Sequence, residues 1–363
     1  MNSNNRNRDQ PANILPAGRV ANQYVYQVPK LDTSIKLRLD RNEGNVAFDD
    51  LDNERILNDP ELARRYPSVK SLEKLLAERF GVAKEQVLVT AGGDDGLLRA
   101  CLAMLEPGRQ IILPVPTFEM LARYTRLAGG EPVEIPWLQS PFPVDEILAR
   151  VNANTSLIAI VSPNNPTGSV ATPDDLRTLS AAAPKSLLLV DLAYTEFADV
   201  DLTEVVLSLP NAVLVRTFSK AWGMAGLRVG FVVGPKSMID WLRCTGNPYP
   251  VSATSAALVA DRFTRSQAAM MAYVDRVRIE RQILFDYLTS KKIAAIPSQA
   301  NFVFAQTPSA ELIWRGLAKR GVAVRWFGGQ PNLIDVLRIT CPGDEAWFEF
   351  LLQAWETVLE CQA

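Results

Sequence analysis

Five short apolar runs, separated by helix-length amphipathic stretches, constrain the fold of this chain more than any other feature. The runs are QVLVT, QIILPVP, SLIAIV, SLLLV and AVLVRT, and they fall between residues 86 and 217. They are rich in Val, Ile and Leu and do not alternate with polar residues, which is typical of parallel strands covered on both faces. We therefore expect an α/β fold whose large domain holds a mostly parallel sheet sandwiched by helices.

The pattern changes after about residue 245. Residues 261–290 predict one long, charged amphipathic helix, and the strand-like runs NFVFA, GVAVRWF and DVLRIT follow before a last helix. This order is typical of a smaller α+β domain, joined by the segment IKLRLDRNEGN near the N-terminus. We predict residues 1–50 as an N-terminal arm and part of the small domain, 51–245 as the large domain, and 246–363 as the small C-terminal domain.

The chain has no histidine among its 363 residues. This excludes Ser-His-Asp and Cys-His nucleophile systems and HExxH zinc sites, so acid–base chemistry falls to Lys, Asp, Glu, Tyr or Cys. The four cysteines show neither CxxC spacing nor a disulfide framework, which favours free thiols in a reducing compartment. We expect no metal site.

Charge and hydropathy narrow the partners further. The 38 basic and 40 acidic side chains nearly balance, with a net charge of −2, so no basic surface for nucleic acid or an anionic membrane is expected. The first residues are polar, without the apolar core of a signal peptide, and no stretch has the length and purity of a membrane span. We predict a cytoplasmic protein that acts on small molecules.

Polar residues cluster just after the strand-like runs, where an open α/β sheet places its ligand crevice. In TAGGDDG, Gly92 and Gly93 precede a helix whose free N–H groups would bind a phosphate, although an ordinary turn capped by Asp94 explains the same letters. The glycines of GMAGLRVG do not follow GxGxxG, and no GxxxxGK[ST] occurs, so neither a dinucleotide fingerprint nor a P-loop is predicted.

Three further residues have ordinary interpretations when each is taken alone. Asp191 at the end of SLLLVD is typical of a turn, SPNNPTG with Asn165 of a proline-rich turn, and Lys220 in RTFSKAWGMAGLRVGF of a solvated lysine. Taken together with Tyr194 and a phosphate site, they suit one cofactor. Pyridoxal 5'-phosphate binds a lysine as a Schiff base and pairs its ring nitrogen with an acid.

The ordered motifs SPNNPTG, VDLAYTEF and TFSKAWGMAGLRVGF resemble those of the fold-type I pyridoxal-phosphate aminotransferases, most closely the histidinol-phosphate aminotransferase branch. Supporting pieces are RLDRNEGN, RYPSVKSLEKLLAERFGV, PVPTFEMLARY, SQANFVFA and LRIT, so the resemblance covers about residues 35 to 355. It implies a PLP-dependent transferase fold with a large and a small domain.

The resemblance also implies roles for the residues that carry the chemistry. Lys220 would form the internal aldimine and move a proton from the substrate, and Asp191 would hold the proton on the pyridine nitrogen. Tyr194 and Asn165 would bond the phenolic oxygen, with Phe118 stacked on the ring. An amino donor would give its amino group to the cofactor, and a 2-oxo acid such as 2-oxoglutarate would take it.

The remaining implied roles concern binding. The groups expected to hold the cofactor phosphate are the main chain at Gly93 and Asp94 with the side chains of Thr217, Ser219 and Arg228. Arg338 in LRIT would bind the carboxylate or phosphate of the substrate. Tyr66 in RRYPS would reach the cofactor phosphate of a neighbouring subunit, which implies a homodimer with shared active sites.

The choice of substrate stays open at this point. The family pattern often reads His-Asn-Pro-Asn-Asn-Pro-Thr-Gly, whereas here Ser162 stands directly before the first proline. Phe118 stands where the branch often has tyrosine, and Asp95 where it often has glutamate. An aminotransferase for an aromatic or other amino acid, and a decarboxylase of the threonine-phosphate type, are therefore kept as alternatives. A non-catalytic module of the same fold is disfavoured by the presence of Lys220.

Overall fold

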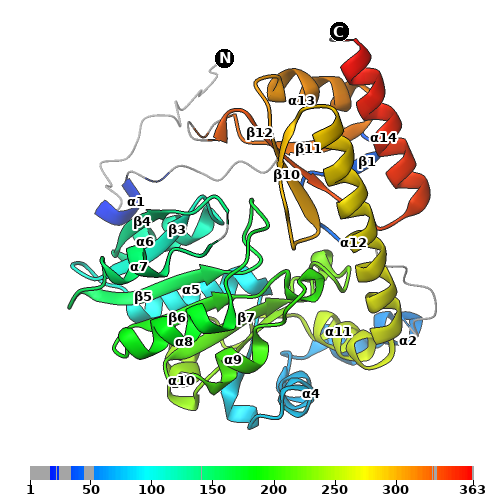
Figure 1. Cartoon of the computed structure of the whole chain (residues 1–363). Helices are drawn as coiled ribbons and strands as arrows, with labels where there is room; N and C mark the ends of the chain where they lie inside the picture. Colours follow the sequence, from blue (N-terminus) through cyan, green and yellow to red (C-terminus); the bar gives the residue numbers. More distant parts are fainter. Residues whose placement is uncertain are drawn as a thin grey trace, which may run out of the picture.

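Two β-sheets organise the computed structural model of this chain, which describes residues 17–21, 23, 34–44, 53–139, 141–328, 330 and 333–361. The larger sheet and its helices form one layered body, and the smaller sheet lies beside it with α12, α13 and α14 (Figure 1). The first sixteen residues, most of the predicted N-terminal arm, lie outside the described residues.

The large sheet contains, among the described residues, seven strands in the order β2-β8-β7-β6-β5-β3-β4. Only β8 runs antiparallel to its neighbours, so the sheet is mostly parallel, as predicted. The bounds are β2 (Val87–Thr90), β3 (Gln110–Val115), β4 (Glu131–Pro136), β5 (Thr155–Val161), β6 (Leu187–Asp191), β7 (Ala212–Thr217) and β8 (Gly230–Val233).

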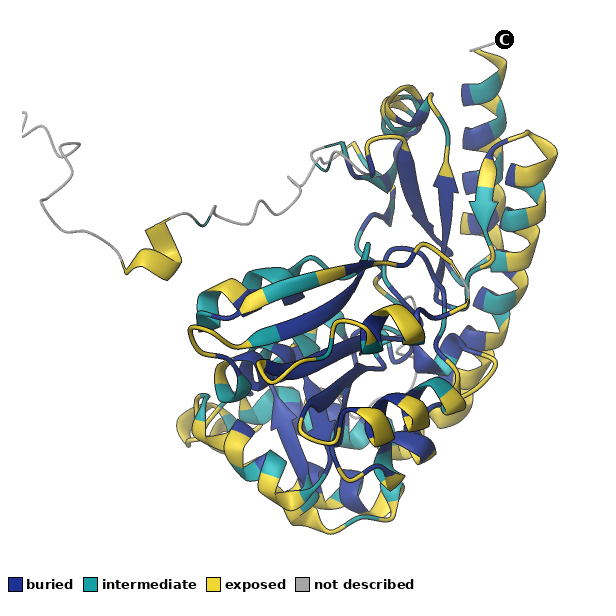
Figure 2. Cartoon of the chain, turned by 60° about the vertical axis from the view of Figure 1, so that its left-hand side comes forward, coloured by how far each residue is buried: buried dark blue, intermediate teal, exposed yellow. Residues whose placement is uncertain are grey.

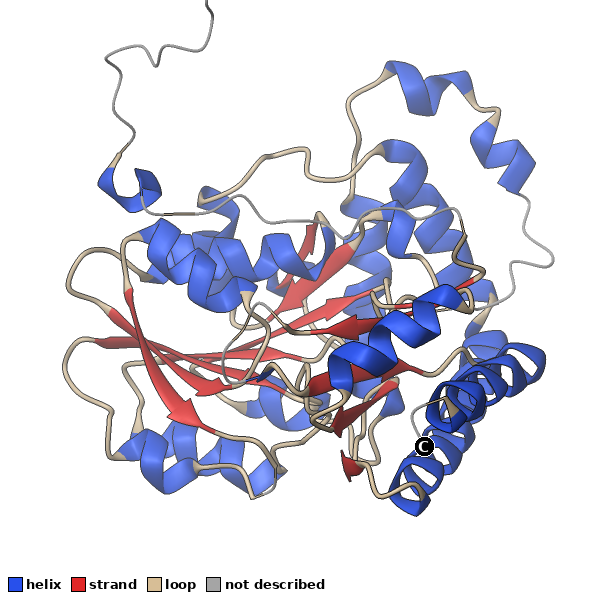
Figure 3. Ribbon diagram, turned by 90° about the horizontal axis from the view of Figure 1, so that it is seen from above, coloured by secondary structure: helices blue, strands red, loops and turns tan. Residues whose placement is uncertain are grey.

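Helices cover both faces of this sheet (Figure 3) because its central strands are apolar on both faces. Leu157 and Ala159 of β5 pack into one core together with residues of α5, α6 and α10, while Ile158 and Ile160 pack into the other. Figure 2 shows the strands as the buried layer beneath helices with exposed outer faces. The helical elements before, between and after these strands are α4 (Lys70–Phe80), η1 (Lys84–Gln86), α5 (Gly92–Met104), α6 (Met120–Ala128), α7 (Val144–Leu148), α8 (Pro173–Ala182), η2 (Thr195–Phe197), α9 (Thr203–Ser208), η3 (Ala225–Leu227) and α10 (Lys236–Cys244).

The small sheet has the order β1-β11-β12-β10-β9 among the described residues. Its first strand comes from the segment IKLRLDRNEGN near the N-terminus and pairs in parallel with β11, and the other pairings are antiparallel. The bounds are β1 (Leu37–Leu39), β9 (Ala294–Ile296), β10 (Phe302–Gln306), β11 (Val322–Trp326), β12 (Val336–Thr340), α13 (Ala310–Lys319) and α14 (Glu345–Glu360).

The prediction of one helix over residues 261–290 is wrong. The chain forms α11 (Ala253–Arg265) and α12 (Gln267–Ser290), separated at Ser266, where ψ of 24° leaves the helical range and the residue caps α11 by donating its N–H to the Arg262 carbonyl. The domain boundary at residue 245 stays a prediction. Helix α11, which follows this position, packs against α2 (Asn53–Leu57), α3 (Pro60–Arg64) and α4 of the large body, and only α12 leads to the second sheet. The short α1 (Gly18–Ala21) contacts α6.

Candidate active site

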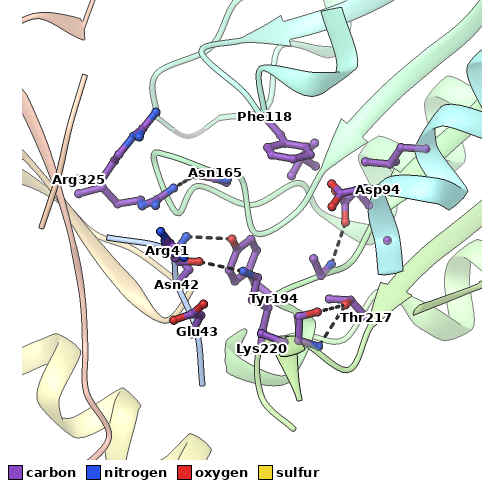
Figure 4. Close-up of a pocket in the computed structure, with 18 of the residues that line it drawn as sticks. Arg41, Asn42, Glu43, Asp94, Phe118, Asn165, Tyr194, Thr217, Lys220 and Arg325 are labelled. Carbon is purple, nitrogen blue, oxygen red and sulfur yellow. Dashed lines mark hydrogen bonds between the residues drawn. The ribbon is translucent and has the colours of Figure 1, made fainter. Parts of the chain in front are cut away.

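A pocket of about 540 Å³ lies between the two sheets, at the carboxyl ends of the parallel strands. This is the position expected for a ligand site in an open α/β sheet. Figure 4 shows Arg325 at one end of the pocket, Asp94 and Thr217 toward the other, and Tyr194 and Lys220 between them.

Eleven of the twelve residues predicted for the site line this pocket, namely Gly93, Asp94, Phe118, Asn165, Asp191, Tyr194, Thr217, Ser219, Lys220, Arg228 and Arg338. They come from the ends of β3, β5, β6 and β7, the start of α5, and β12 of the small sheet. The fold thus brings together residues up to 245 positions apart (338 − 93). Tyr66, the twelfth, does not line the pocket.

Asp191 ends β6 and is only 6% exposed. Its Oδ1 accepts a hydrogen bond of 3.0 Å from the N–H of Ala193, and the structure gives the carboxylate no ion pair among the described residues. Burial raises the pKa of Asp191 to about 7, with the Asp94 charge adding to the shift, while the Ala193 bond and the Lys220 charge oppose it. A buried carboxylate of this kind is a strong partner for a cationic or protonated ligand atom.

Tyr194 follows the same strand and is fixed by a residue of the segment that follows β1 in the small sheet. Its hydroxyl accepts a 2.9 Å hydrogen bond from Nδ2 of Asn42, whose Oδ1 accepts one of 2.8 Å from the hydroxyl of Thr340. Asn42 sits in the left-handed region with φ of 54°, a conformation that asparagine tolerates better than most residues. Burial raises the pKa of Tyr194 to about 12, so its hydroxyl keeps its proton and can donate it to a ligand oxygen.

Lys220 follows β7 and points into the pocket from a tightly packed loop (Figure 4). Its Nζ donates a 3.2 Å hydrogen bond to the carbonyl of Arg41 and lies 5.7 Å from the centre of the Tyr194 ring. A Cβ on Gly44 would stand 1.9 Å from the Lys220 carbonyl oxygen, so the approach of the two segments requires glycine there. Burial lowers the pKa of Lys220 to about 8, and the Arg338 charge acts in the same direction.

The start of α5 forms the end of the pocket near β7. Its first residues, Gly92 and Gly93, have free main-chain N–H groups at the positive end of the helix dipole, and the hydroxyls of Thr217 and Ser219 lie in the same pocket. Helix α5 begins before Asp94, so Asp94 is not its cap. A Cβ on Gly92 would stand 2.7 Å from Nη2 of Arg228.

Arg228 contacts this end through an ion pair that the sequence did not predict. Its Nη2 lies 3.1 Å from Oδ2 of Asp94, and both side chains are about half exposed. The second terminal nitrogen of the same guanidinium, Nη1, donates a hydrogen bond to the Ala225 carbonyl. Together with two hydroxyls and the helix start, the guanidinium makes this end suited to a phosphate.

Two arginines from the small sheet form the opposite end of the pocket. Arg338 is 7% exposed, and its guanidinium donates to Oδ1 of Asn165 at 2.6 Å and to the carbonyl of Asp40 at 2.9 Å. Arg325 stands directly opposite on β11 in the antiparallel register and also lines the pocket. Two guanidinium groups side by side favour a doubly charged acidic group.

Tyr66 is 82% exposed, and its ring stacks on that of Tyr249 with centroids 4.7 Å apart. The turn that carries Tyr249 is tied to α5 by Arg99, whose guanidinium donates to the Asn247 carbonyl at 3.0 Å and to Oδ1 of Asp95 at 3.0 Å. Asp95 in turn accepts from the N–H of Ala91, just before the helix. The exposed tyrosine pair is therefore connected to the helix that begins at the pocket.

Sequence reasoning missed several pocket residues: Asp40, Arg41, Asn42, Glu43, Leu97, Val161, Ala193, Ala225 and Arg325. The first four follow β1 in RLDRNEGN, whose concentration of charged and amide residues next to a short strand was the available signal. Arg325 lies in GVAVRWF, where a charge after an alternating apolar run marks it, but nothing in the sequence places it opposite Arg338.

Comparison with known proteins agrees with this architecture. The solved histidinol-phosphate aminotransferase of Sinorhizobium meliloti, in complex with pyridoxal-5'-phosphate, superimposes with a TM-score of 0.80 at 23% identity, covering 91% of this chain and 92% of that one. The L-threonine-O-3-phosphate decarboxylase of Porphyromonas gingivalis superimposes with a TM-score of 0.76 at 20% identity, covering 89% of this chain and 99% of that one. These likenesses establish the fold, that of the fold-type I pyridoxal-phosphate enzymes.

The sequence itself then defines the family. The model of the family "Aminotransferase class I and II" matches residues 36–354, and histidinol-phosphate aminotransferase 1 of Nostoc sp. is 34% identical over 345 residues, 92% of this chain and 94% of that protein. The chain belongs to the class I and II aminotransferases. This confirms the predicted family, fold class, enzyme class and pyridoxal 5'-phosphate cofactor.

No group of three or more His, Cys, Asp or Glu side chains among the described residues could hold a metal ion. None of the helices described here has the length and apolar character needed to cross a membrane.

Proposed function

We propose that this protein transfers the amino group of L-histidinol phosphate to a 2-oxo acid such as 2-oxoglutarate. One observation carries the proposal: a single pocket holds a lysine amine beside a buried carboxylate and, at its far end, the paired guanidinium groups of Arg325 and Arg338. A donor that fits must have an amino group at one end and an acidic group at the other. The name of the Nostoc relative supports the phosphorylated donor.

The residues present fit pyridoxal 5'-phosphate. Asp191 is a buried carboxylate without an ion-pair partner among the described residues, and a protonated ring nitrogen would supply one. The start of α5 with Thr217, Ser219 and Arg228 would hold the phosphate, with the main chain of Gly93 and Asp94 as donors. Phe118 would cover one face of the ring, and Tyr194 and Asn165 would bond its hydroxyl oxygen.

When bound, the cofactor supplies an electron sink for the charge that develops when a proton leaves the donor carbon. Lys220 provides the base, because its lowered pKa leaves a substantial unprotonated fraction near neutral pH. Asp191 keeps the ring nitrogen protonated, and Tyr194 donates from its hydroxyl. Asn42 and Thr340 hold that hydroxyl in place.

The acidic group of the donor would be held by Arg338 and Arg325. Arg338 is positioned by Asn165, by the Asp40 carbonyl and by the Phe302 ring, whose centre lies 5.4 Å from its Cζ. This rigid placement fixes the distance between the acidic end and Lys220. Discrimination among acidic donors would then depend on how well their length and charge match that distance.

A single-turnover titration tests the donor. The cofactor-loaded protein, without any 2-oxo acid, is mixed with L-histidinol phosphate and in parallel with phenylalanine and L-threonine phosphate, and the absorbance of the cofactor is followed. We expect L-histidinol phosphate to convert the cofactor to its amino form most efficiently. Absence of conversion by this donor, with conversion by another, would transfer the assignment to that donor.

The same titration separates transamination from decarboxylation. Release of carbon dioxide from L-threonine phosphate, with the cofactor unchanged at the end, would favour the decarboxylase. The names of the curated relatives favour the aminotransferase.

Lys220→Ala is expected to lose turnover and the visible colour of the bound cofactor, whereas Lys236→Ala, at an exposed lysine on α10, is expected to change neither. Turnover retained in Lys220→Ala would contradict the role of the lysine.

We further propose a homodimer with shared sites, located in the cytoplasm. Tyr66 is exposed and outside the pocket of its own chain, so a role at a cofactor phosphate requires a second copy. Mixing inactive Lys220→Ala with Tyr66→Ala and re-forming dimers would create one site with an intact lysine and an intact tyrosine. We expect activity to return on mixing, and no return would mean that Tyr66 does not act across subunits.

The four free cysteines support the proposed cytoplasmic location, because thiols stay reduced in that compartment.

A further inference from the structure

Glu119 occupies an unusual place at the edge of the pocket. It stands at the N-cap of α6, but its side chain makes no capping hydrogen bond with that helix. The carboxylate instead crosses to the small sheet, where Oε1 lies 3.8 Å from Nη2 of Arg325 and Oε2 accepts a 3.3 Å hydrogen bond from Nε2 of Gln330. A negative charge therefore lies beside the arginine pair at the acid-binding end.

The two arginines differ in how firmly they are held. Arg338 donates hydrogen bonds to Asn165 and to the Asp40 carbonyl, and it is buried. Arg325 makes no hydrogen bond to any residue in the described ranges, and its contacts are the Glu119 carboxylate and the Phe327 ring, 5.5 Å from its Cζ. Its donors are thus available to an incoming oxyanion, with Glu119 as the competing anion.

We propose that Glu119 sets the charge preference of the acid-binding end by holding Arg325 until the acidic group of the donor replaces it. Arg325, Arg338 and Glu119 together carry a net charge of +1, whereas the two guanidinium groups alone would carry +2. A dianion therefore gains less from binding than it would without the carboxylate. The side chains of Glu119 and Arg325 are 30% and 24% exposed, so the pair is weak enough for a ligand to replace. This inference rests on the proposed function for the identity of the donor alone.

A purely structural role makes a different prediction. If Glu119 only joined α6 to the small sheet through Gln330 and Arg325, its loss would alter the binding of all donors equally. If it sets charge, its loss strengthens the binding of ligands in proportion to the negative charge of their acidic group and leaves donors without an acidic group unchanged. The isosteric Glu119→Gln removes the charge, and its amide oxygen can still accept from Gln330.

The experiment uses the cofactor-loaded protein, so that the phosphate site at α5 is filled. Binding of inorganic phosphate is measured by calorimetry, and KM is measured for L-histidinol phosphate and for the unphosphorylated L-histidinol. An exposed pair is worth up to about 1 kcal/mol, which is about fivefold in affinity. We expect Glu119→Gln to tighten phosphate and lower the KM of L-histidinol phosphate by up to about fivefold, with the KM of L-histidinol unchanged.

Glu134→Gln is the matched control, because Glu134 is an exposed glutamate on β4 that does not line the pocket. A double-mutant cycle with Arg325→Gln adds a second readout, and we expect the Glu119 effect to be smaller in the Arg325→Gln background. Equal changes for L-histidinol and its phosphate, or an effect no larger than that of Glu134→Gln, would overturn the proposal. If no donor is turned over, the proposed function fails, and the phosphate titration alone still decides the role of Glu119.

Discussion

Replacing Asp191 by asparagine should stabilise the cofactor-free protein at pH 8. The carboxyl has a pKa of about 7 in the folded protein, because of burial, against 3.8 as its ordinary value. The folded state therefore binds this proton more tightly than the unfolded chain, and the free energy of unfolding falls as pH rises from 3.8 to 7. At about 1.4 kcal/mol per pKa unit, the whole loss is about 4 kcal/mol.

Asparagine carries no charge at any of these pH values and can still accept the N–H of Ala193. The advantage of Asp191→Asn should therefore be small near pH 4 and grow by about 3 kcal/mol between pH 5 and pH 8. Urea unfolding of the cofactor-free protein at the two pH values measures it. Asp199→Asn is the control, since Asp199 is an exposed carboxylate in the segment that follows the same strand.

Loading the cofactor should reverse the order. The protonated ring nitrogen would give the wild-type carboxylate the partner that it lacks, so the cofactor should stabilise wild type more than Asp191→Asn. The variant is also expected to bind the cofactor more weakly and to be nearly inactive. An advantage of the cofactor-free variant that did not change with pH, or that matched Asp199→Asn, would refute the assignment of Asp191 as an unpaired buried charge.

Two other substitutions test the framework of the site. Gly44→Ala should reduce cofactor binding and lower the melting temperature, because the added Cβ would stand 1.9 Å from the Lys220 carbonyl oxygen. Gly18→Ala is the control and should do neither, because its Cβ would meet nothing within 4 Å. Equal effects of the two substitutions would contradict the packing argument. Arg99→Met should destabilise the protein by about 3 kcal/mol in urea unfolding, because it leaves the Asp95 carboxylate and the Asn247 carbonyl without the buried guanidinium that binds them. Arg177→Met, at an exposed pair, should cost less than about 1 kcal/mol, and a similar cost at both sites would be evidence against a special role for Arg99.

The parts of the fold that follow from local pattern were predictable. Strands buried on both faces must be apolar throughout, and β5, β6 and β7 show this directly in the sequence. Strand β4, with Pro132 and Pro136, gave no such signal, because it is an edge strand with only one buried position and does not need an apolar run. The short β9 has no buried residue and was missed for the same reason.

The site was predictable where one motif carries several functional residues and not where two distant strands supply one each. Lys220 and Arg228 share a recognisable segment, whereas Arg325 comes to line the pocket beside Arg338 only through the register of their two strands. Glu119 is adjacent to the predicted Phe118, but its role depends on a contact 206 residues away in the chain (325 − 119). Contacts of this kind depend on the relative placement of the two sheets, which no local periodicity specifies.

The pocket has groups that titrate near neutral pH although the chain contains no histidine. Burial raises the pKa of Asp191 to about 7 and lowers that of Lys220 to about 8, so both groups titrate close to neutral pH. Each shift has burial as its largest cause, and the two are opposite in direction because one group is charged when deprotonated and the other when protonated. A carboxyl and an amine, desolvated in the same pocket, can thus hold and accept protons in the pH range where proteins usually depend on imidazole.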